Sequence, residues 1–330
     1  MLRRPELESA LEIVRQRSAL FSQTSWDNAG LGPIHLFERL QSTNQTLWQL
    51  IAQGAGPGTV AIAAEQDTGR GQWGRTWVSR PGGLYLSLAL APDLLAANGA
   101  QLTLAVAWGI AMAFRHWQIP VQLKWPNDLV LSGHKLGGIL TETRVRQHKI
   151  VTAVIGVGIN WANPVPAPGI NLTTFLAHQS TDSSKLMRKL EWKSTSEGGE
   201  LQLSDRSSDE ENAIAPAIDS LAMVAALTLE GCLSGYHRWQ QEGIESLLAD
   251  YQALLSNIGQ PVQVKTGSGI VVGVSATGEL LVRLTATSPA ATLDRSGRRP
   301  LPANEHTTAT PEIALKPGMI RLGYPAQPLS

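Results

Sequence analysis

Two arginines alternate with glycines in a short segment of the chain, EQDTGRGQWGRTW at residues 65–77. Its glycines allow the backbone to come close to a ligand, and Arg70 and Arg75 supply permanent positive charge that suits phosphate or carboxylate. The segment is not a Gly-Lys-Ser/Thr phosphate-binding loop, and no helical pattern follows it as in a dinucleotide-binding fingerprint. Two interpretations stay open, a cationic loop that closes over a nucleotide and a solvated hairpin loop.

A second segment, KWPNDLVLSGHKLGGIL, places two lysines on either side of a turn. Lys124 ends a predicted strand, and a proline bends the chain before Asn127 and Asp128. Lys135 comes shortly before a Gly-Gly pair that permits close approach. These groups could hold a nucleotide and its metal ion. An ordinary Pro-Asn-Asp turn in a β-hairpin is the simpler alternative.

Two further segments are weaker signals on their own. Ser42-Thr43-Asn44 precedes a predicted helix, where such residues commonly cap the helix and can also bind a polar ligand group. The segment IGVGIN ends at Asn160 after a strand that contains glycines. Glycines of this kind often mark only close packing, but the amide of Asn160 could also bind phosphate or sugar.

The order STN, GRGxxGRxW, KWPND, KxxGIL and GxGIN resembles the biotin–protein ligase family, closely over residues 35–160 and loosely through the C-terminal region. The resemblance implies a two-step reaction. Biotin attacks Mg-ATP to give biotinyl-5′-AMP, and a lysine of a carrier protein, such as that of acetyl-CoA carboxylase, then takes the biotin. The implied ligands are biotin, ATP and Mg²⁺, and the implied partner is a biotin carboxyl carrier protein.

The resemblance also implies roles for individual residues. The expected catalytic residues are Lys135, Arg70 and Lys124. The expected biotin-binding residues are Ser42, Thr43, Asn44, Gln66, Gly69, Arg70, Gly71, Gln72, Lys135, Gly137 and Gly138. The expected nucleotide-binding residues are Arg75, Trp77, Lys124, Asn127, Asp128 and Asn160, with Asp128 as the candidate metal ligand. Positive side chains suit this chemistry, because a carboxylate and a triphosphate must be brought together.

Two features depart from the family's pattern. Gln72 and Trp73 replace two arginines that many members carry, so we expect either faster escape of the adenylate or compensation by packing of Trp73. Residues 1–33 are too short for the winged helix that repressor members carry, and the chain has 27 basic and 27 acidic residues. We therefore expect a ligase without repressor function that binds no nucleic acid.

Two rival functions share parts of this pattern. A lipoate–protein ligase would have the same fold and acyl-adenylate chemistry, but the KWPND and GRGxxGRxW segments favour biotin. A biotin-binding regulator without catalysis would be expected to carry a nucleic-acid-binding module, and the pattern shows none. The presence of Lys124 and Lys135 also favours catalysis.

Strand and helix patterns predict an α+β fold with a mixed, largely antiparallel sheet. The resemblance adds a relationship to class II aminoacyl-tRNA synthetases and a small C-terminal SH3-like β-barrel. The expected parts are an N-terminal helix and loop (1–33), a catalytic domain (34–257) with a disordered insertion (177–215), and a barrel (258–330) with a long loop (286–311). Helices are also expected at 101–118, 217–234 and 237–255.

The composition excludes several classes of protein. The one cysteine, Cys232, rules out an internal disulfide and a cysteine-cluster zinc site. The N-terminus lacks the apolar core of a signal peptide, and the chain has no uninterrupted apolar run of about 18 residues. We therefore expect a cytoplasmic protein, either a monomer or a homodimer, without a membrane span.

Overall fold

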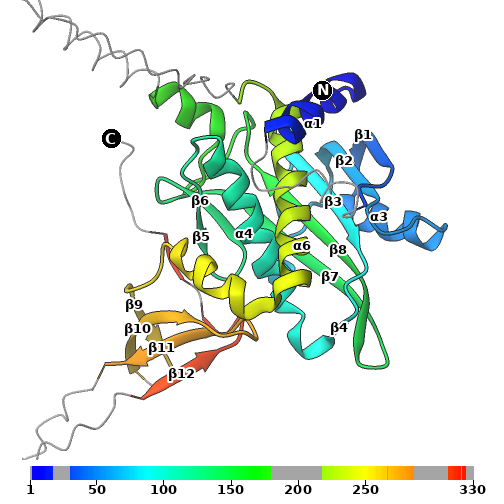
Figure 1. Ribbon diagram of the computed structural model, residues 1–330. Helices are drawn as coiled ribbons and strands as arrows, with labels where there is room; N and C mark the ends of the chain where they lie inside the picture. The colour runs from blue at the N-terminus through cyan, green and yellow to red at the C-terminus, as the bar shows by residue number, and fades with distance from the viewer. Residues whose placement is uncertain are drawn as a thin grey trace, which may run out of the picture.

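The computed structural model describes residues 2–17, 30–179, 218–265, 267–285, 311–320 and 322–324. Its largest element is a mixed sheet with strand order β1-β2-β3-β8-β7-β6-β5, with β4 paired to β8 (Figure 1). Strands β1 and β2 are parallel, and the other neighbouring pairs of this sheet are antiparallel. The strands are β1 (Ile34–Leu40), β2 (Val60–Gln66), β3 (Leu84–Leu90), β4 (Leu94–Leu95), β5 (Gln122–Lys124), β6 (Asp128–Leu131), β7 (His134–Arg146) and β8 (Lys149–Ile159). The predicted mixed, largely antiparallel sheet with helices is confirmed.

Helices cover both faces of this sheet. The helices are α1 (Arg4–Arg17), α3 (Thr43–Ala52), α4 (Ala100–His116) and α6 (Leu221–Ala253), with short 3-10 turns η1 (Gln72–Gly74) and η2 (Ala96–Asn98) and a helical stretch at 172–179. Helices α4 and α6 lie side by side, as Figure 1 shows, and make the most extensive helix–helix contact of the described chain. The predicted N-terminal helix is confirmed, since Leu7, Ala10 and Val14 of α1 are buried.

Side-chain alternation gives the two faces of the sheet different chemistry. Successive strand residues point to opposite faces. On β3, Leu86 and Leu88 belong to the large core that also contains α4 and α6, whereas Ala89 packs in a second cluster with Leu47 of α3. Ser87 points to this α3 side, where it contacts residues at the start of that helix. One face therefore carries the core, and the α3 face can carry polar groups.

Helices α4 and α6 approach each other at glycines. A Cβ added to Gly109 would lie 2.0 Å from the carbonyl oxygen of Gly231, and one added to Gly235 would lie 2.0 Å from that of Ala105. The predicted helix boundary near residues 235–236 is therefore wrong, because Gly235 serves this close contact inside a continuous helix. The chain leaves helical geometry later, at Gly243, where φ is 77°.

One described helix has the length and composition of a membrane span. The stretch Ala96–His116 contains an 18-residue window with a mean hydropathy of 1.2, and 72% of that window is buried inside the protein. Burial of this extent is what the core helix of a folded domain shows, and α4 packs here between the sheet and α6. Its apolar composition is therefore accounted for by packing.

A second, four-stranded antiparallel sheet follows, in the order β12-β11-β10-β9. Its strands are β9 (Pro261–Val264), β10 (Gly267–Val274), β11 (Leu280–Leu284) and β12 (Glu312–Leu315). The sheet docks on the larger body through Trp125, whose Nε1 donates to the Gly278 carbonyl at 2.9 Å, and through Gln101, whose amide donates to Ala276 at 3.0 Å. These four strands lie within residues 258–330, where the small β-barrel was expected. Closure into an SH3-like barrel and the domain boundaries stay predictions, and most of the stretches 177–215 and 286–311 lies outside the described residues.

Candidate active site

A cavity on the α3 face of the sheet brings the four sequence segments together. We call it the ligand cavity. Its lining comprises Ser42, Thr43, Asn44, Gln66, Arg70, Gly71, Gln72, Arg75, Thr76, Trp77, Asn127, Lys135, Gly138, Ile139, Leu140, Gly156, Val157 and Gly158. These residues come from the start of α3, the glycine-rich loop after β2, the turn before β6, and strands β7 and β8. The arrangement places polar groups at one end and cationic groups at another.

The polar end of the ligand cavity is the N-terminus of α3. Ser42 is the N-cap residue, with extended backbone angles but no side-chain capping bond. The residue is buried and lines the ligand cavity. The backbone N–H of Thr43 donates to Oε1 of Gln66 at 2.8 Å, which ties this helix start to the end of β2. A hydroxyl that does not cap its own helix, together with the helix N-terminus, is suited to a polar ligand group.

A buried hydrogen-bond chain lies beneath this polar end. Oγ of Ser87 lies 2.7 Å from Oγ1 of Thr43 and donates to Oδ1 of Asn44 at 2.6 Å. A Cβ on Gly156 would lie 2.3 Å from Oδ1 of Asn44, so a glycine is required opposite this amide. Sequence reasoning missed Ser87. Its signal was a serine inside the otherwise apolar strand LYLSLAL.

The glycine-rich loop forms a narrow hairpin that lines the ligand cavity. The N–H of Trp77 donates to the Gly69 carbonyl at 2.9 Å, and that of Gly71 donates to the Arg75 carbonyl at 2.7 Å. A Cβ on Gly69 would lie 2.4 Å from both Oγ of Ser79 and the Trp77 carbonyl oxygen, so this glycine permits the hairpin's close approach. The hairpin directs Arg75 and Trp77 into the cavity lining.

Trp77 forms a flat wall of the ligand cavity. Its indole lies on β8, where a Cβ on Gly158 would come within 2.5 Å of Nε1 and Cε2. The Nζ of Lys135 lies 5.3 Å from the centroid of the same ring. Nε1 of Trp77 is buried and has no hydrogen-bond partner in the described chain. A buried unpaired donor is costly, so a ligand acceptor at this place would be stabilising.

The cationic end of the site extends into a second cavity beneath the C-terminal residues. We call it the lysine cavity. Its lining comprises Gln72, Trp73, Arg75, Lys124, Trp125, Pro126, Asp128, Lys135, Gly318, Ile320, Leu322 and Tyr324. Nζ of Lys135 lies 2.6 Å from Oδ1 of Asp128, whose Oδ2 accepts a hydrogen bond from the Tyr324 hydroxyl. Nζ of Lys124 donates to the Leu322 carbonyl at 2.6 Å and lies 3.5 Å from the Tyr324 ring centroid.

Burial perturbs two groups in the lysine cavity. The pKa of Lys124 is lowered to about 8, chiefly by desolvation; the Asp128 carboxylate opposes this shift, and the charges of Lys135 and Arg75 contribute to it. Burial, together with the Asp128 carboxylate, raises the pKa of the Tyr324 hydroxyl, which therefore keeps its proton and donates to that carboxylate. Sequence reasoning missed Tyr324, because no local pattern connects it with residues almost 200 positions earlier.

Trp73 contacts the C-terminal residues and lines the lysine cavity, not the ligand cavity. Its side chain is 61% exposed and lies against Gly318, where an added Cβ would come within 3.0 Å of Cζ2. This contact supports the expectation that Trp73 packs where related proteins have arginine. Retention of the adenylate through this packing stays a prediction.

Three of the residues assigned from the resemblance line neither the ligand cavity nor the lysine cavity. Asn160 donates to the Lys135 carbonyl at 3.4 Å and accepts from the amide of Asn163, so it orders the backbone around Lys135. Gly137 faces the core side, where an added Cβ would meet Leu129 and the Gly158 carbonyl. Gly69 lines an adjoining cavity with Glu142. Their assigned ligand contacts stay predictions.

Asp128 is the one predicted metal ligand. No group of three or more His, Cys, Asp and Glu side chains suited to a metal occurs in the described part of the chain. Mg²⁺ bound together with ATP needs only one or two protein carboxylates, because phosphates and waters supply its other ligands. Asp128 fits that role as a single carboxylate, provided that the Tyr324 hydroxyl leaves Oδ2.

Comparison with known proteins gives the class of the chain. The model of the biotin/lipoate A/B protein ligase family matches residues 36–160. The chain is 30% identical over 263 residues to a protein of Salmonella typhimurium, an alignment that covers 78% of this chain and 68% of the relative. The chain belongs to the biotin/lipoate A/B protein ligase family.

Similarity to proteins of known name extends over different parts of the chain. The Salmonella protein is the bifunctional ligase/repressor BirA, and the protein of the same name from Bacillus subtilis is 37% identical over 123 residues. That second alignment covers 37% of this chain and only 38% of the Bacillus relative. A biotin protein ligase from Aquifex aeolicus, solved in complex with biotin and ATP, has the same fold with a TM-score of 0.54 at 22% identity. The match covers 76% of this chain and 91% of the Aquifex chain.

Proposed function

We propose that the chain is an ATP-dependent biotin–protein ligase that makes biotinyl-5′-AMP and transfers biotin to a lysine of a carrier protein. The observation that carries the proposal is the polarity of the ligand cavity. Its Ser42–Asn44 end offers neutral hydrogen-bonding groups, and the charge of Arg70 beside this end is paired with Glu142. Arg75 and Lys135 form a cationic end that continues into the lysine cavity. A ligand with a neutral polar head and a carboxylate tail, which is the chemistry of biotin, is complementary to this layout.

The first step joins two anions. A carboxylate oxygen of biotin attacks the α-phosphorus of ATP, a new O–P bond forms, and the bond to the leaving pyrophosphate breaks. Lys135 and Arg75 line both the ligand cavity and the lysine cavity, and they lie where the carboxylate and the phosphate would meet. Catalysis of this kind consists mainly of positioning and electrostatic stabilisation. Asp128 orients the Lys135 ammonium through their 2.6 Å ion pair.

The second step transfers the acyl group. The amine of the carrier lysine attacks the carbonyl carbon of biotinyl-5′-AMP, a C–N bond forms, and the C–O bond to AMP breaks with loss of a proton from nitrogen. The glycine-rich loop, which includes Arg70, lines the cavity in which the adenylate would lie. A loop in that position protects an anhydride from water. Mg²⁺ enters with ATP as part of the substrate, with Asp128 as its proposed protein ligand.

Lipoate is the alternative substrate, and the polar end of the cavity disfavours it. A dithiolane ring offers no N–H or C=O group to the Ser42 hydroxyl or to the start of α3, whereas a ureido ring offers both. A site with buried hydrogen-bonding groups discriminates strongly against a ligand that leaves them unpaired. A regulator that binds biotin without turnover is the second alternative. The pairing of Lys135 with Asp128 beside Arg75 favours chemistry over binding alone.

The test is incubation of the full chain with biotin, ATP, Mg²⁺ and a biotin carrier domain. We expect biotin-dependent exchange of labelled pyrophosphate into ATP and a carrier that gains the mass of a biotinyl group. Lipoate in place of biotin is the matched control. Exchange with lipoate alone would reassign the substrate, and binding of biotin without exchange would favour the regulator. No exchange and no binding with either acid would end the proposal.

A further inference from the structure

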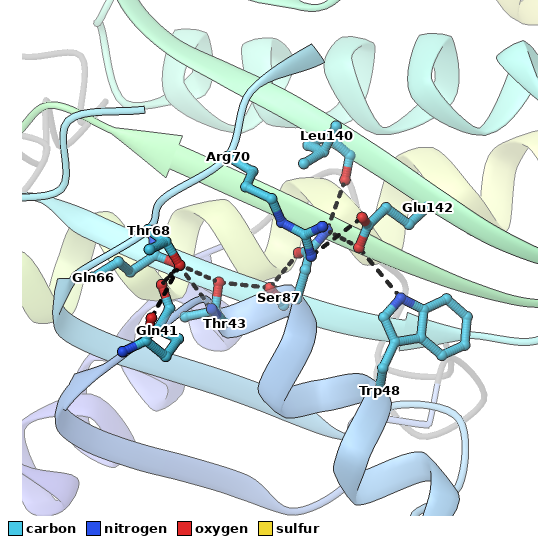
Figure 2. A network of polar contacts seen from close by, with 10 residues as sticks. Gln41, Thr43, Trp48, Gln66, Thr68, Arg70, Ser87, Leu140 and Glu142 are labelled. Carbon is cyan, nitrogen blue, oxygen red and sulfur yellow. Dashed lines mark hydrogen bonds and ion pairs between the residues drawn. The ribbon is translucent and has the colours of Figure 1, made fainter. Parts of the chain in front are cut away.

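Glu142 connects the glycine-rich loop with the polar end of the ligand cavity, and neither the sequence motifs nor the proposed reaction assigns it a role. It lies on β7, on the α3 face of the sheet, with 27% of its side chain exposed. Oε1 lies 3.4 Å from a guanidinium nitrogen of Arg70. Oε2 accepts from Nδ2 of Asn44 at 2.9 Å and from Nε1 of Trp48 at 3.3 Å. Figure 2 shows Arg70 and Trp48 directed toward the carboxylate of Glu142 from opposite sides of the network.

A carboxylate at this place has an electrostatic cost. The proposed reaction brings a carboxylate and a triphosphate into the neighbouring cavity, and a free negative charge on Glu142 would repel both. Its contacts offset that cost, because Arg70 supplies an opposite charge and two N–H groups donate to the other oxygen. Both oxygens of the Glu142 carboxylate are therefore paired with neighbouring side chains, and Glu142 would affect a bound ligand by positioning those side chains.

The contact with Asn44 determines the orientation of an amide in the cavity wall. Oδ1 of Asn44 accepts from Ser87, and Nδ2 donates to Glu142. An acceptor beyond Nδ2 and a donor beyond Oδ1 permit one of the two amide orientations. The remaining contact of Nδ2, to the Leu140 carbonyl, is long at 3.5 Å and would hold the amide weakly by itself.

The contact with Arg70 holds the loop against the sheet. Arg70 lines the ligand cavity and, together with Glu142, the adjoining cavity. The other hydrogen bonds and ion pairs of the loop in the described chain lie within its own hairpin or at its base, as with Thr68, which hydrogen-bonds to Gln41. Its two tryptophans add packing contacts, Trp73 against Gly318 and Trp77 against β8. The Arg70–Glu142 pair is thus a tie between the tip of the loop and the strand that carries Lys135.

We propose that Glu142 is a positioning residue, which orients the Asn44 amide in the ligand cavity and ties the glycine-rich loop to β7 through Arg70. Only the expected effect of Glu142 on biotin binding rests on the proposed function. The tie between loop and strand is a property of the protein alone. It can therefore be tested on the ligand-free chain, whatever the substrate is.

Chymotrypsin cleavage after Trp73 reports how often the loop opens, because this exposed tryptophan lies near the loop tip. Glu142→Gln removes the ion pair but leaves an oxygen that can accept from Asn44. Exposed ion pairs contribute about 0.2–1 kcal/mol, so we expect cleavage about two- to fivefold faster. Arg70→Gln should have the same effect, and the double variant should cleave no faster than either single variant. High salt should accelerate cleavage of the unchanged protein and not of Glu142→Gln.

Glu38→Gln is the matched control, since it makes the same charge change on an exposed strand position of β1. Cleavage of Glu142→Gln at the rate of this control, or additive effects of Arg70→Gln and Glu142→Gln, would overturn the tie. The cleavage fragment that ends at Trp73 is identified by its mass, so cuts elsewhere do not enter the measurement.

Biotin titration tests the second half of the proposal. Glu142→Ala leaves the Asn44 amide without its short acceptor, and loss of one such hydrogen bond should weaken biotin binding about five- to tenfold. Glu142→Gln should bind within about twofold of the unchanged protein, because it restores the acceptor. Equal losses in both variants, or unchanged binding in Glu142→Ala, would refute the orienting role. Absence of biotin binding by the unchanged protein would instead refute the proposed function and leave the cleavage result standing.

Discussion

Replacing Gly158 by alanine should push Trp77 out of its place in the cavity wall. The added Cβ would lie 2.5 Å from Cε2 and Nε1 of Trp77, about 1 Å closer than ordinary van der Waals contact allows. Overpacking of this kind costs about 1–3 kcal/mol, and relief of the glycine's backbone entropy in a strand returns about 0.5–1 kcal/mol. The free energy of unfolding should therefore fall by about 0.5–2 kcal/mol. At about 2–4 °C per kcal/mol, the Tm should fall by about 1–8 °C.

The functional effect should exceed the effect on stability. Trp77 is the predicted neighbour of the adenine, and stacking of a base on an aromatic side chain contributes about 1–3 kcal/mol. ATP titrated in the absence of biotin should therefore bind about tenfold more weakly to Gly158→Ala. Gly56→Ala is the matched control, because an added Cβ at Gly56 meets no atom within 4 Å.

A double-mutant cycle separates this steric cause from a general defect. In a Trp77→Ala background the indole is absent, so Gly158→Ala should be neutral or slightly stabilising. Thermal unfolding of the four proteins gives the coupling energy directly. If Gly158→Ala lowers Tm equally in both backgrounds, or binds ATP as tightly as the unchanged protein, the clash with Trp77 is not the cause and the reasoning fails.

Three further predictions concern the lysine cavity and the helix pair. Lys135→Ala should lower biotin-dependent pyrophosphate exchange about 10²–10³-fold, because a donor to developing charge is lost; Lys149→Ala, which removes an exposed lysine paired with a carboxylate, should exchange normally. Since burial lowers the pKa of Lys124 to about 8, its charge is lost as pH rises through about 8, so kcat/KM for ATP should decline there and Lys124→Gln should lack that inflection. The same shift makes the burial of a charged Lys124 destabilising, fully so below about pH 8 and less as pH rises toward 10.5. The free energy of unfolding of the unchanged protein, measured with denaturant, should therefore rise between about pH 8 and 10.5 relative to that of Lys124→Gln. Gly109→Ala should lower the free energy of unfolding by about 2 kcal/mol or more, because its Cβ would lie 2.0 Å from a backbone oxygen of α6; a Tm equal to that of Gly56→Ala would contradict the close helix contact.

Much of the fold was accessible from local pattern. Local pattern predicted the N-terminal helix, the helix at 101–118 and the mixed sheet, and the glycine-rich loop, the Pro-Asn-Asp turn and the N-cap cluster lie where the pattern placed them. The boundary inside α6 was misplaced because a glycine weakens a helix locally, and only its partner helix shows that Gly235 is there to permit close packing. The 3-10 turns and the two-residue strand β4 are too short to leave a periodic signal.

The sequence by itself determined which kinds of group the site contains. The arginines and glycines of the loop, the lysines around the turn and the hydroxyls before α3 are local features, whose charge and conformational freedom follow from residue type. Their membership of one cavity became an expectation only through the resemblance to a family, since spacing along the chain does not specify how strands pair.

The tertiary structure decided which side chains complete the site. Glu142 reaches Asn44 across 98 positions of the chain, and Tyr324 reaches Asp128 across 196. The contact of Glu142 depends on the register of β7 against β8, because a change of register by one residue would turn its side chain to the other face of the sheet. The contact of Tyr324 depends on the docking of the C-terminal residues. Non-local pairing of this kind is set by the packing of the whole core, so Glu142, Ser87 and Tyr324 joined the site only in the folded chain.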